Sequence, residues 1–528
     1  MHRPIAVFLT ALALSLTTLT VPAMGQDAMT FSKDVAPILF DKCVTCHRPY
    51  EAAPMPLRSY DEVRPWARGI KEKVVSREMP PWFANPRHGS FKNDPTLSEE
   101  EISTITAWVD AGAPRGDPAD LPELPAFSDG WALGQPDYIV ELPEVTVPAE
   151  GPDYYPDLSF TMDDLPEKRW VRAIEVRPGN RKVTHHSVVF TNGNPGQGQS
   201  RQRSGFFDVL VVWSVGTNPH VFPDGVGRWL YPGQTLTVNA HYHPSGEVET
   251  DVTRIGVYWG KGELKKELTA VLAGTMSFEI PPRARNHELR SSYIIDQDST
   301  VISYFPHMHV RGKDMKMIAN YPNGETETLI DVPEYDFDWQ FFYYPAEKVS
   351  LPAGTRLDIV AHYDNSELNP ENPDPNKTIG FGTTTNDEMM FTVFEFVADE
   401  GVSPTPATAE TRREALVASL PSDSVYRVDL PMMGRALPTA LHLPKSGEGT
   451  WYIPMRGNLL VMPAKNITWK GETYSFDMQI RLGPMGGDFV VKGQVDNGAI
   501  SGDFEGSGMI PFSSFEGALT ERERPGGE

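Results

Sequence analysis

Cysteine is nearly absent from this 528-residue chain, which holds only Cys43 and Cys46. Disulfides therefore cannot tie its domains together, although exported proteins use them freely, and ordinary packed cores must supply the stability. Long apolar runs are also scarce. Beyond the first 25 residues no stretch is long and apolar enough to span a bilayer, so we expect no integral membrane segment.

Positive charge is the third thing in short supply. The chain has 47 basic residues against 71 acidic ones, a formal net charge of −24. Nucleic acid is therefore an unsuitable partner, because its phosphates require neutralising cations. With 40% hydrophobic and 22% charged residues, the composition predicts packed globular domains. The length is enough for several of them.

The first apolar run stands at the N-terminus, in "MHRPIAVFLTALALSLTTLTVPAMGQ". A basic start, an apolar run and small residues near its end are typical of an export signal. We expect cleavage after Gly25. The sequence thus predicts an exported protein, either periplasmic or secreted.

The two cysteines lie in "CVTCH", residues 43–47. A CxxCH run is typical of covalent c-type haem attachment, in which both thiols add to the haem vinyl groups and the histidine binds iron. This assigns Cys43, Cys46 and His47 to a haem c. The alternatives are a redox pair and half of a zinc site. The adjacent histidine, the export signal and the lack of other cysteines argue against both.

The surroundings of this motif predict a small all-α, cytochrome c-like domain. The segments "TFSKDVAPILFDKCVTCH", "SYDEVRPWARGIKEKVVS" and "LSEEEISTITAWVDAGAP" are typical of helices, the last with Ser98 as its N-cap. A methionine thioether is a common sixth haem ligand. We assign this role to Met79, in "SREMPPWF", with Met55 as the competitor.

The middle of the chain is rich in short β-prone runs such as "HSVVFT" and "FDVLVVWSV", which predict antiparallel sandwiches. It also contains a repeat: "PGQTLTVNAHYHPSG" resembles "PAGTRLDIVAHYDNS". His186 precedes His241 by 55 residues, and His307 precedes His362 by the same interval. This favours two duplicated β-sandwich domains with histidines at matching positions.

Histidine spacing points to metal. Residues i and i+2 of a strand share a face, so His307 and His309 can converge on one ion, as can His241 and His243. The adjacent pair at 185–186 would point to opposite faces of a regular strand. Both can bind one ion only if the backbone is bulged there.

The donor set narrows the choice of metal. No spare thiolate exists for a structural zinc site. Imidazole suits copper, zinc, iron and nickel, whereas thioether sulfur selects copper(I). The β-prone stretch "TTNDEMMFTVFEF" offers Met389 and Met390. A methionine facing His307 and His309 would complete a copper site with two imidazoles and one sulfur.

Four motifs, "HH", "HYH", "HMHVRGK" and "DEM", occur in that order between residues 137 and 400. In this respect the chain resembles the copper type II, ascorbate-dependent monooxygenases, the family of peptidylglycine hydroxylating monooxygenase and dopamine β-monooxygenase. The resemblance implies two jelly-roll-like sandwich domains, each holding one copper, with solvent between them. It also implies hydroxylation of an aliphatic C–H bond with O2.

The resemblance further implies a ligand set for each of two copper ions. The electron-transfer copper would bind His185, His186 and His241, and the oxygen-binding, catalytic copper would bind His307, His309 and Met389.

Three departures from the family stand out. The animal enzymes are rich in disulfides, whereas this core has no cysteine. Geometry alone does not favour His241 over His243. The duplication also places His362 where a third ligand of the second domain would stand, although the family uses the methionine.

The family chemistry requires two electrons per O2, and the fused haem is a candidate donor to the His185/His186/His241 copper. The expected partners are O2, an unknown small-molecule or peptide substrate and an external electron donor to the haem. The C-terminal strands predict a small all-β barrel or sandwich of unknown role, in which His442 is structural.

The expected organisation is as follows: signal peptide, 1–25; cytochrome c-like domain, 26–115; linker, 116–136; first copper-binding β-sandwich, 137–275; second copper-binding β-sandwich, 276–400; linker and helix, 401–424; C-terminal β domain, 425–520.

Overall fold

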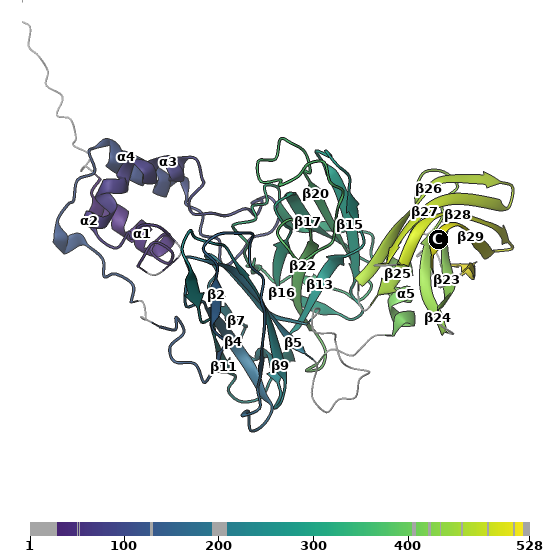
Figure 1. Cartoon of the computed structure of the whole chain (residues 1–528), viewed down its shortest axis with the longest axis horizontal. Coiled ribbons are helices and arrows are strands. Elements are labelled where there is room, and N and C mark those ends of the chain that lie inside the picture. Colours follow the sequence, from purple (N-terminus) through teal and green to yellow (C-terminus); the bar gives the residue numbers. More distant parts are fainter. Residues whose placement is uncertain are drawn as a thin grey trace, which may run out of the picture.

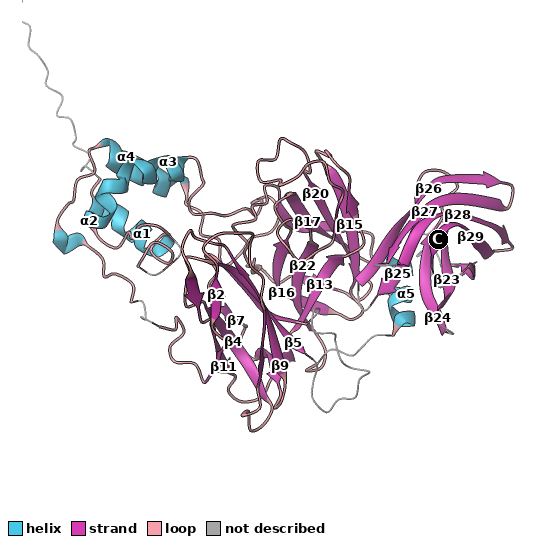
Figure 2. Cartoon of the chain, viewed as in Figure 1, coloured by secondary structure: helices cyan, strands magenta, loops and turns pink. Residues whose placement is uncertain are grey.

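The protein is a mostly β, multidomain chain with a few N-terminal helices, several sheets and a closed eight-stranded barrel near the C-terminus (Figures 1 and 2). The computed structural model describes residues 29–49, 51, 53–126, 130–192, 208–403, 408–420, 424–432, 435–455, 458–482, 485–510 and 513–520. The expected export signal lies outside these residues. Among those described, no helix has the length and apolar character needed to cross a bilayer.

The N-terminal helices form a helical module around one core. They are the turn Phe31–Val35, α1 (Ala36–Lys42), α2 (Tyr60–Val63) with the turn Arg64–Trp66, α3 (Ala67–Val75), α4 (Glu99–Asp110) and the turn Pro118–Asp120. The start of α4 is set as expected. The Oγ of Ser98 accepts from the backbone N–H of Glu101, whose carboxylate accepts from the N–H of Ser98 at 2.7 Å. Trp108, fully buried, packs near Phe31 in the core.

The first β module, β1–β12, follows. Its strands are β1 (Tyr138–Glu141), β2 (Val145–Val147), β3 (Asp157–Thr161), β4 (Arg169–Arg177), β5 (Thr184–Asn192), β6 (Val209–Ser214), β7 (His220–Val221), β8 (Val226–Leu230), β9 (Thr235–Tyr242), β10 (Glu249–Asp251), β11 (Arg254–Trp259) and β12 (Lys266–Glu267). One sheet has the order β1-β11-β4-β8-β12 with β7 on β4, and the other has β3-β9-β5-β6. Apolar residues of both sheets share one core, including Ile174 and Val238.

The second β module, β13–β22, repeats this two-sheet plan. Its strands are β13 (Thr269–Thr275), β14 (Glu279–Ile280), β15 (His287–Ile294), β16 (Ser299–His307), β17 (Gly312–Asn320), β18 (Thr326–Val332), β19 (Ser350–Leu351), β20 (Arg356–Tyr363), β21 (Ile379–Gly380) and β22 (Met390–Ala398). The orders are β13-β22-β16-β19 and β18-β17-β20-β15. Strand β13 lies before the expected boundary at 275/276, yet it pairs with β22.

An apolar interface joins the two β modules. Phe190 and Val212 of the first module cluster with Phe305, Phe342 and Phe391 of the second. Because these side chains are buried between the modules rather than within either one, the modules hold one another in place.

The C-terminal region contains α5 (Ala409–Ser419) and a barrel. The barrel strands are β23 (Val425–Met432), β24 (Arg435–His442), β25 (Gly449–Met455), β26 (Asn458–Lys470), β27 (Thr473–Leu482), β28 (Met485–Asp496), β29 (Ala499–Met509) and β30 (Ser514–Leu519). Pairing runs β26-β25-β24-β23-β30-β29-β28-β27 and closes through β26–β27. Of the two expected architectures, barrel or sandwich, the structure thus shows the barrel.

A segment of the helical module, residues 80–96, reaches across to the second β module; we call it the strap. The ring of Trp82 lies 4.8 Å from that of Tyr343, and Phe91 lies 5.4 Å from the same ring. Asn85 donates from its side-chain amide to Asp331 at 2.7 Å. The strap therefore anchors the helices to the loop that precedes β19.

Candidate metal centre

A bulge in β5 brings two adjacent histidines to the same side. In the β5–β9 pairing, Thr184 lies opposite Tyr242 and His186 lies opposite His241, so His185 is the extra residue. The sequence predicts that His185 and His186 can bind one ion only if the backbone is bulged there. The structure confirms the bulge.

Three imidazoles converge at this bulge. The Nδ1 atoms of His185 and His186 are 3.0 Å apart, and those of His186 and His241 are 3.4 Å apart. Metal–imidazole bonds of about 2.0 Å place the nitrogens of a trigonal or tetrahedral site roughly 3.3–3.5 Å apart. All three side chains are buried. This group, which we call the triad, could hold a metal ion.

The ring nitrogens of the triad are available for coordination. The Nε2–H of His241 donates to Asp153 Oδ2 at 2.9 Å, which leaves its Nδ1 lone pair facing the other two rings. Burial lowers the pKa of His241 to about 4. Burial, reinforced by the neighbouring histidines, also holds the pKa of His186 well below its usual value. Neutral imidazoles are the metal-binding form.

His243 belongs to a different group. Its Nδ1–H donates to Asp153 Oδ1 at 2.6 Å, and 44% of its side chain is exposed, against none for His241. Asp153, His241 and His243 form a second cluster that could hold a metal ion. The structure thus separates the two histidines of "HYH", which sequence geometry left equivalent.

His307 and His309 form a pair at the end of β16. Their ring centroids are 5.3 Å apart. Each Nδ1 has a hydrogen-bond acceptor: Gln340 Oε1 at 2.7 Å for His307, and the backbone carbonyl of Asp387 at 3.2 Å for His309. Both Nε2 atoms therefore remain for a ligand. Burial lowers the pKa of His307 to about 4 and that of His309 to about 3.

The structure separates the two candidate methionines. Met390 is fully buried in the core of the second β module, near Met308. His307 lies opposite Phe391 in the β16–β22 register, and Met389 clusters with Phe391 at the interface between the modules. Because strand residues alternate in direction, Phe391 faces the side of His307 and Met390 points into the core. Met389, which directly precedes β22, packs against the cluster that contains Phe391.

Glu388 binds backbone N–H groups of the segment that carries His309 and of the segment that carries Met389. Its buried carboxylate accepts from the N–H of His309 at 2.8 Å, of Arg311 at 2.8 Å and of Met389 at 3.2 Å. Burial raises the pKa of Glu388 to about 7. One carboxylate thus holds the "HMH" turn and the methionine segment together.

The two histidine groups lie next to each other. The ring centroids of His186 and His307 are 6.4 Å apart. The resemblance led us to expect solvent between the two sites, and for these rings that expectation is wrong. The apolar interface between the β modules draws the two strand ends together.

A single loop, residues 333–345, contacts both groups; we call it the bridging loop. Phe337 stacks on His185 with centroids 5.0 Å apart, and its ring lies 5.8 Å from that of His309. Gln340 binds His307, as above, and its carbonyl accepts from Ser214 Oγ at 2.6 Å. The loop thus touches ligand candidates from both β modules.

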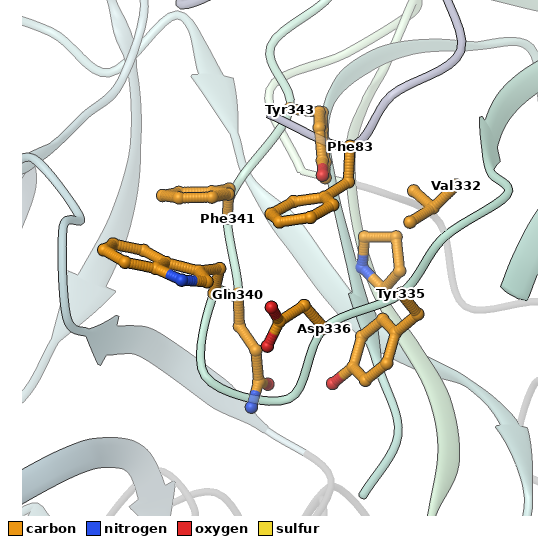
Figure 3. Close-up of a pocket in the computed structure, with 9 residues that line it drawn as sticks. Phe83, Val332, Tyr335, Asp336, Gln340, Phe341 and Tyr343 are labelled. Atoms are coloured by element: carbon orange, nitrogen blue, oxygen red, sulfur yellow. The ribbon is translucent and has the colours of Figure 1, made fainter. Parts of the chain in front are cut away.

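Aromatic side chains surround this loop. Tyr335, Phe341 and Tyr343 line a small pocket together with Phe83 of the strap. Asp336 lies among them, and the side chain of Gln340 points downward in this view (Figure 3). The sequence did not reveal the role of this loop, although the run "EYDFDWQFFYYP" is dense in acidic and aromatic residues. That density was the available signal.

If the His307/His309 pair holds a metal ion, Gln340→Leu should weaken its binding. Leucine cannot accept the Nδ1–H, so the orientation of the His307 ring is lost. We expect a 10–100-fold fall in metal affinity, as is typical for such supporting residues. Competition titration with a copper chelator measures it. Gln479→Leu in the barrel strand β27 is the control and should leave the affinity unchanged.

The CxxCH residues lie on one helical turn. The N–H of His47 donates to the carbonyl of Cys43 at 2.9 Å, and its Nδ1 donates to the carbonyl of Met55 at 3.1 Å. This leaves Nε2 for iron. Both cysteines are unpaired thiols. The donor set therefore fits a covalently held haem.

The two methionine candidates occupy different environments. Met55 packs at the core of the helical module, as does Cys43. Met79 follows α3, is half-buried, and donates from its backbone N–H to Lys73. Met79 also begins the chain segment that continues as the strap.

An open cavity of about 180 Å³ lies between the CxxCH turn and the first β module. Cys46 lines one side, and Arg177, Arg181 and Trp213 line the other. Trp213 lies opposite Ser187 in the β5–β6 pairing, next to the histidines of the triad along β5. The cavity therefore lies between the CxxCH turn and the strand pair that carries the triad.

The repeat does not place its histidines equivalently. His186 and His241 face each other on paired strands. His307 and His362 lie on β16 and β20, which belong to different sheets. The expectation of matching positions is therefore wrong for this pair. The ring of His362 instead pairs with Asp314 at 2.7 Å and lies 3.4 Å from Glu288, both on neighbouring strands.

His220 forms a buried polar network that the sequence did not reveal. Its Nε2 lies 3.1 Å from Glu395 Oε1, its Nδ1 lies 2.7 Å from the Tyr344 hydroxyl, and Ser303 Oγ donates to Glu395 at 2.5 Å. The network connects β7 of the first module with β16 and β22 of the second. It therefore adds buried polar contacts to the interface, whose core is apolar.

Glu395→Gln should destabilise the interface between the β modules. An amide cannot accept from both His220 and Ser303, and a buried group left without its partner costs about 1–3 kcal/mol. Thermal unfolding should therefore begin at a lower temperature than in the parent protein. An unchanged unfolding profile would show that the network adds no stability.

The sequence matches no protein-family model, and a search of curated proteins finds no match. The function is therefore inferred from the arrangement of the described residues.

Proposed function

We propose that the protein is an exported haem- and dicopper-dependent monooxygenase related to the copper type II, ascorbate-dependent family. It would hydroxylate an aliphatic C–H bond of a small-molecule or peptide substrate. The balance is R–H + O2 + 2e⁻ + 2H⁺ → R–OH + H2O. One observation carries the proposal. The triad lies next to the His307/His309 pair, and Met389 packs in the interface cluster beside that pair.

Each residue group has a role in this proposal. Cys43, Cys46 and His47 hold haem c, with Met79 as the sixth ligand and Met55 as its competitor. The triad of His185, His186 and His241 holds the electron-transfer copper, and His307, His309 and Met389 hold the catalytic copper. Copper in these sites would supply one-electron transfer and O2 activation, since thioether sulfur stabilises copper(I).

The arrangement of the modules supports an internal supply of electrons. The cavity beside Cys46 reaches Trp213, whose strand neighbours the triad. The rings of His186 and His307 then continue the path across the module interface. In this proposal the two β modules are jelly-roll-like sandwiches, and residues 26–115 form a cytochrome c-like module. An external donor would reduce the haem.

A second candidate is a copper-binding electron-transfer protein without catalysis. The position of Phe337, against histidines of both groups, favours it, because this ring fills space that a substrate would need.

One experiment tests both candidates. The haem-loaded, copper-loaded protein is reduced and mixed with O2 labelled with ¹⁸O in a stopped-flow instrument, with candidate substrates present. We expect haem reoxidation only when both coppers are bound, with one label in the product. Haem oxidation that is unaffected by copper removal would refute the relay. Copper-dependent oxidation that yields unlabelled product with every substrate would favour the second candidate.

A further inference from the structure

His241 stands between two clusters of donor atoms, and each of its ring nitrogens faces a different one. Its Nδ1 lies 3.4 Å from the Nδ1 of His186, within the triad. Its Nε2 lies 2.9 Å from Asp153 Oδ2. The imidazole is a rigid ring, so a metal on one nitrogen leaves the other nitrogen directed at the second cluster.

The second cluster has three donors for an ion of its own. Asp153 Oδ1 lies 2.6 Å from His243 Nδ1, and the donor atoms of Asp153, His241 and His243 all lie within 4.8 Å of one another. The side chain of His243 is 44% exposed, so water can reach the cluster. Water would supply the remaining coordination position.

Neighbouring side chains hold this cluster in place from both β modules. The ring of Tyr155 stacks on that of His241, with centroids 4.6 Å apart and an interplanar angle of 16°. Thr385, from the segment that leads to Met389, donates from Oγ1 to Asp153 Oδ2 at 3.0 Å. The carboxylate is thus positioned by residues outside the strand pair that carries the histidines.

We propose that Asp153, His243 and the Nε2 atom of His241 bind a zinc ion, so that the His241 imidazole bridges zinc to the metal of the triad. The Nε2 proton leaves to solvent as zinc binds, and no redox change is involved. The bridge rests on the metal-binding part of the proposed function, namely an ion in the triad. The zinc cluster itself does not depend on monooxygenase activity.

The donor chemistry distinguishes the two ions. The triad offers three imidazoles and no oxygen, which suits copper. The second cluster offers two imidazoles, a carboxylate and an open position, a set that is typical of zinc. A hard carboxylate ligand disfavours copper(I). Copper(I) should therefore bind in the triad, and zinc should bind in the second cluster.

Metal analysis of the haem-loaded full-length protein, after anaerobic exposure to copper(I) and zinc and removal of excess metal, tests the proposal, because copper(II) would compete with zinc for the second cluster. We expect two coppers and one zinc per chain. His243→Ala should lose the zinc and keep both coppers, and Asp153→Asn should also lose the zinc. His362→Ala is the matched control, because this strand histidine also pairs with a carboxylate, Asp314, yet should lose no metal. Absence of zinc from the parent protein would overturn the proposal and would show that Asp153 only orients His241.

A magnetic readout tests the bridge separately. Cobalt(II) in place of zinc should suppress the electron paramagnetic resonance signal of one of the two copper(II) ions, through the shared imidazole, and His243→Ala should restore it. Bound cobalt with both copper signals unchanged would refute the bridge. A protein that binds zinc but no copper in the triad would instead contradict the proposed function and leave the zinc cluster standing.

Discussion

His186→Ala should nearly abolish the oxidation of reduced haem by O2. His186 is the central ring of the triad, with its Nδ1 within 3.4 Å of both partners, and it is also the ring that approaches His307. Its removal takes away both a proposed metal ligand and the contact between the two histidine groups. Changes to supporting residues reach roughly 100-fold, so loss of a direct ligand should exceed that.

Single-turnover stopped-flow absorbance of the haem measures this effect, and metal analysis should show one copper fewer per chain. His442→Ala, in the barrel strand β24, is the control and should reoxidise at the parent rate. A fast haem reaction in His186→Ala would mean that electrons reach O2 without the triad.

Met389→His should retain copper yet lose most turnover. Imidazole is a good copper ligand, so metal uptake is preserved. It stabilises copper(I) less than thioether sulfur does, and copper(I) is the form required to react with O2. We expect product formation under steady-state conditions to fall by at least tenfold while copper content stays at the parent value.

The adjacent residue provides the control for Met389. Met390→Leu changes a side chain that points into the core of the second β module. A volume-conserving core change of this kind usually costs under about 1.5 kcal/mol, so turnover should be unchanged. Equal activity in Met389→His and the parent protein would remove Met389 from the ligand set. A loss in Met390→Leu alone would mean that the two methionines were assigned in the wrong order.

Local sequence patterns predicted the parts of the site that depend on neighbouring residues. The i, i+2 spacing of His307 and His309 and the need for a bulge at 185–186 both follow from strand geometry, and the structure shows the bulge. The sequence also predicted Ser98 as the N-cap of α4, and the structure confirms it. Alternation along a strand could not choose between Met389 and Met390, because that choice depends on which sheet face meets the other module.

Features that depend on long-range packing were out of reach. The bridging loop contacts His185 and His309 only because the β modules press together. The network around Glu395 joins residues whose partners lie far along the chain. The repeat predicted matching histidine positions, and this was wrong for the same reason. The similar segments around His241 and His362 occupy different positions in their sheets. Sequence similarity reports local strand character, whereas sheet order is decided by the whole fold.

The strap has a practical consequence for anyone who wishes to take this protein apart. A shortened version that begins at the first β module would strip Trp82 and Phe91 from the ring of Tyr343, and so uncover the aromatic side of the bridging loop. Such a fragment would lose both the proposed electron donor and the contacts that hold the bridging loop beside His307 and His309. Replacing the natural donor with a foreign cytochrome would therefore require residues 80–96 to be grafted along with the rest.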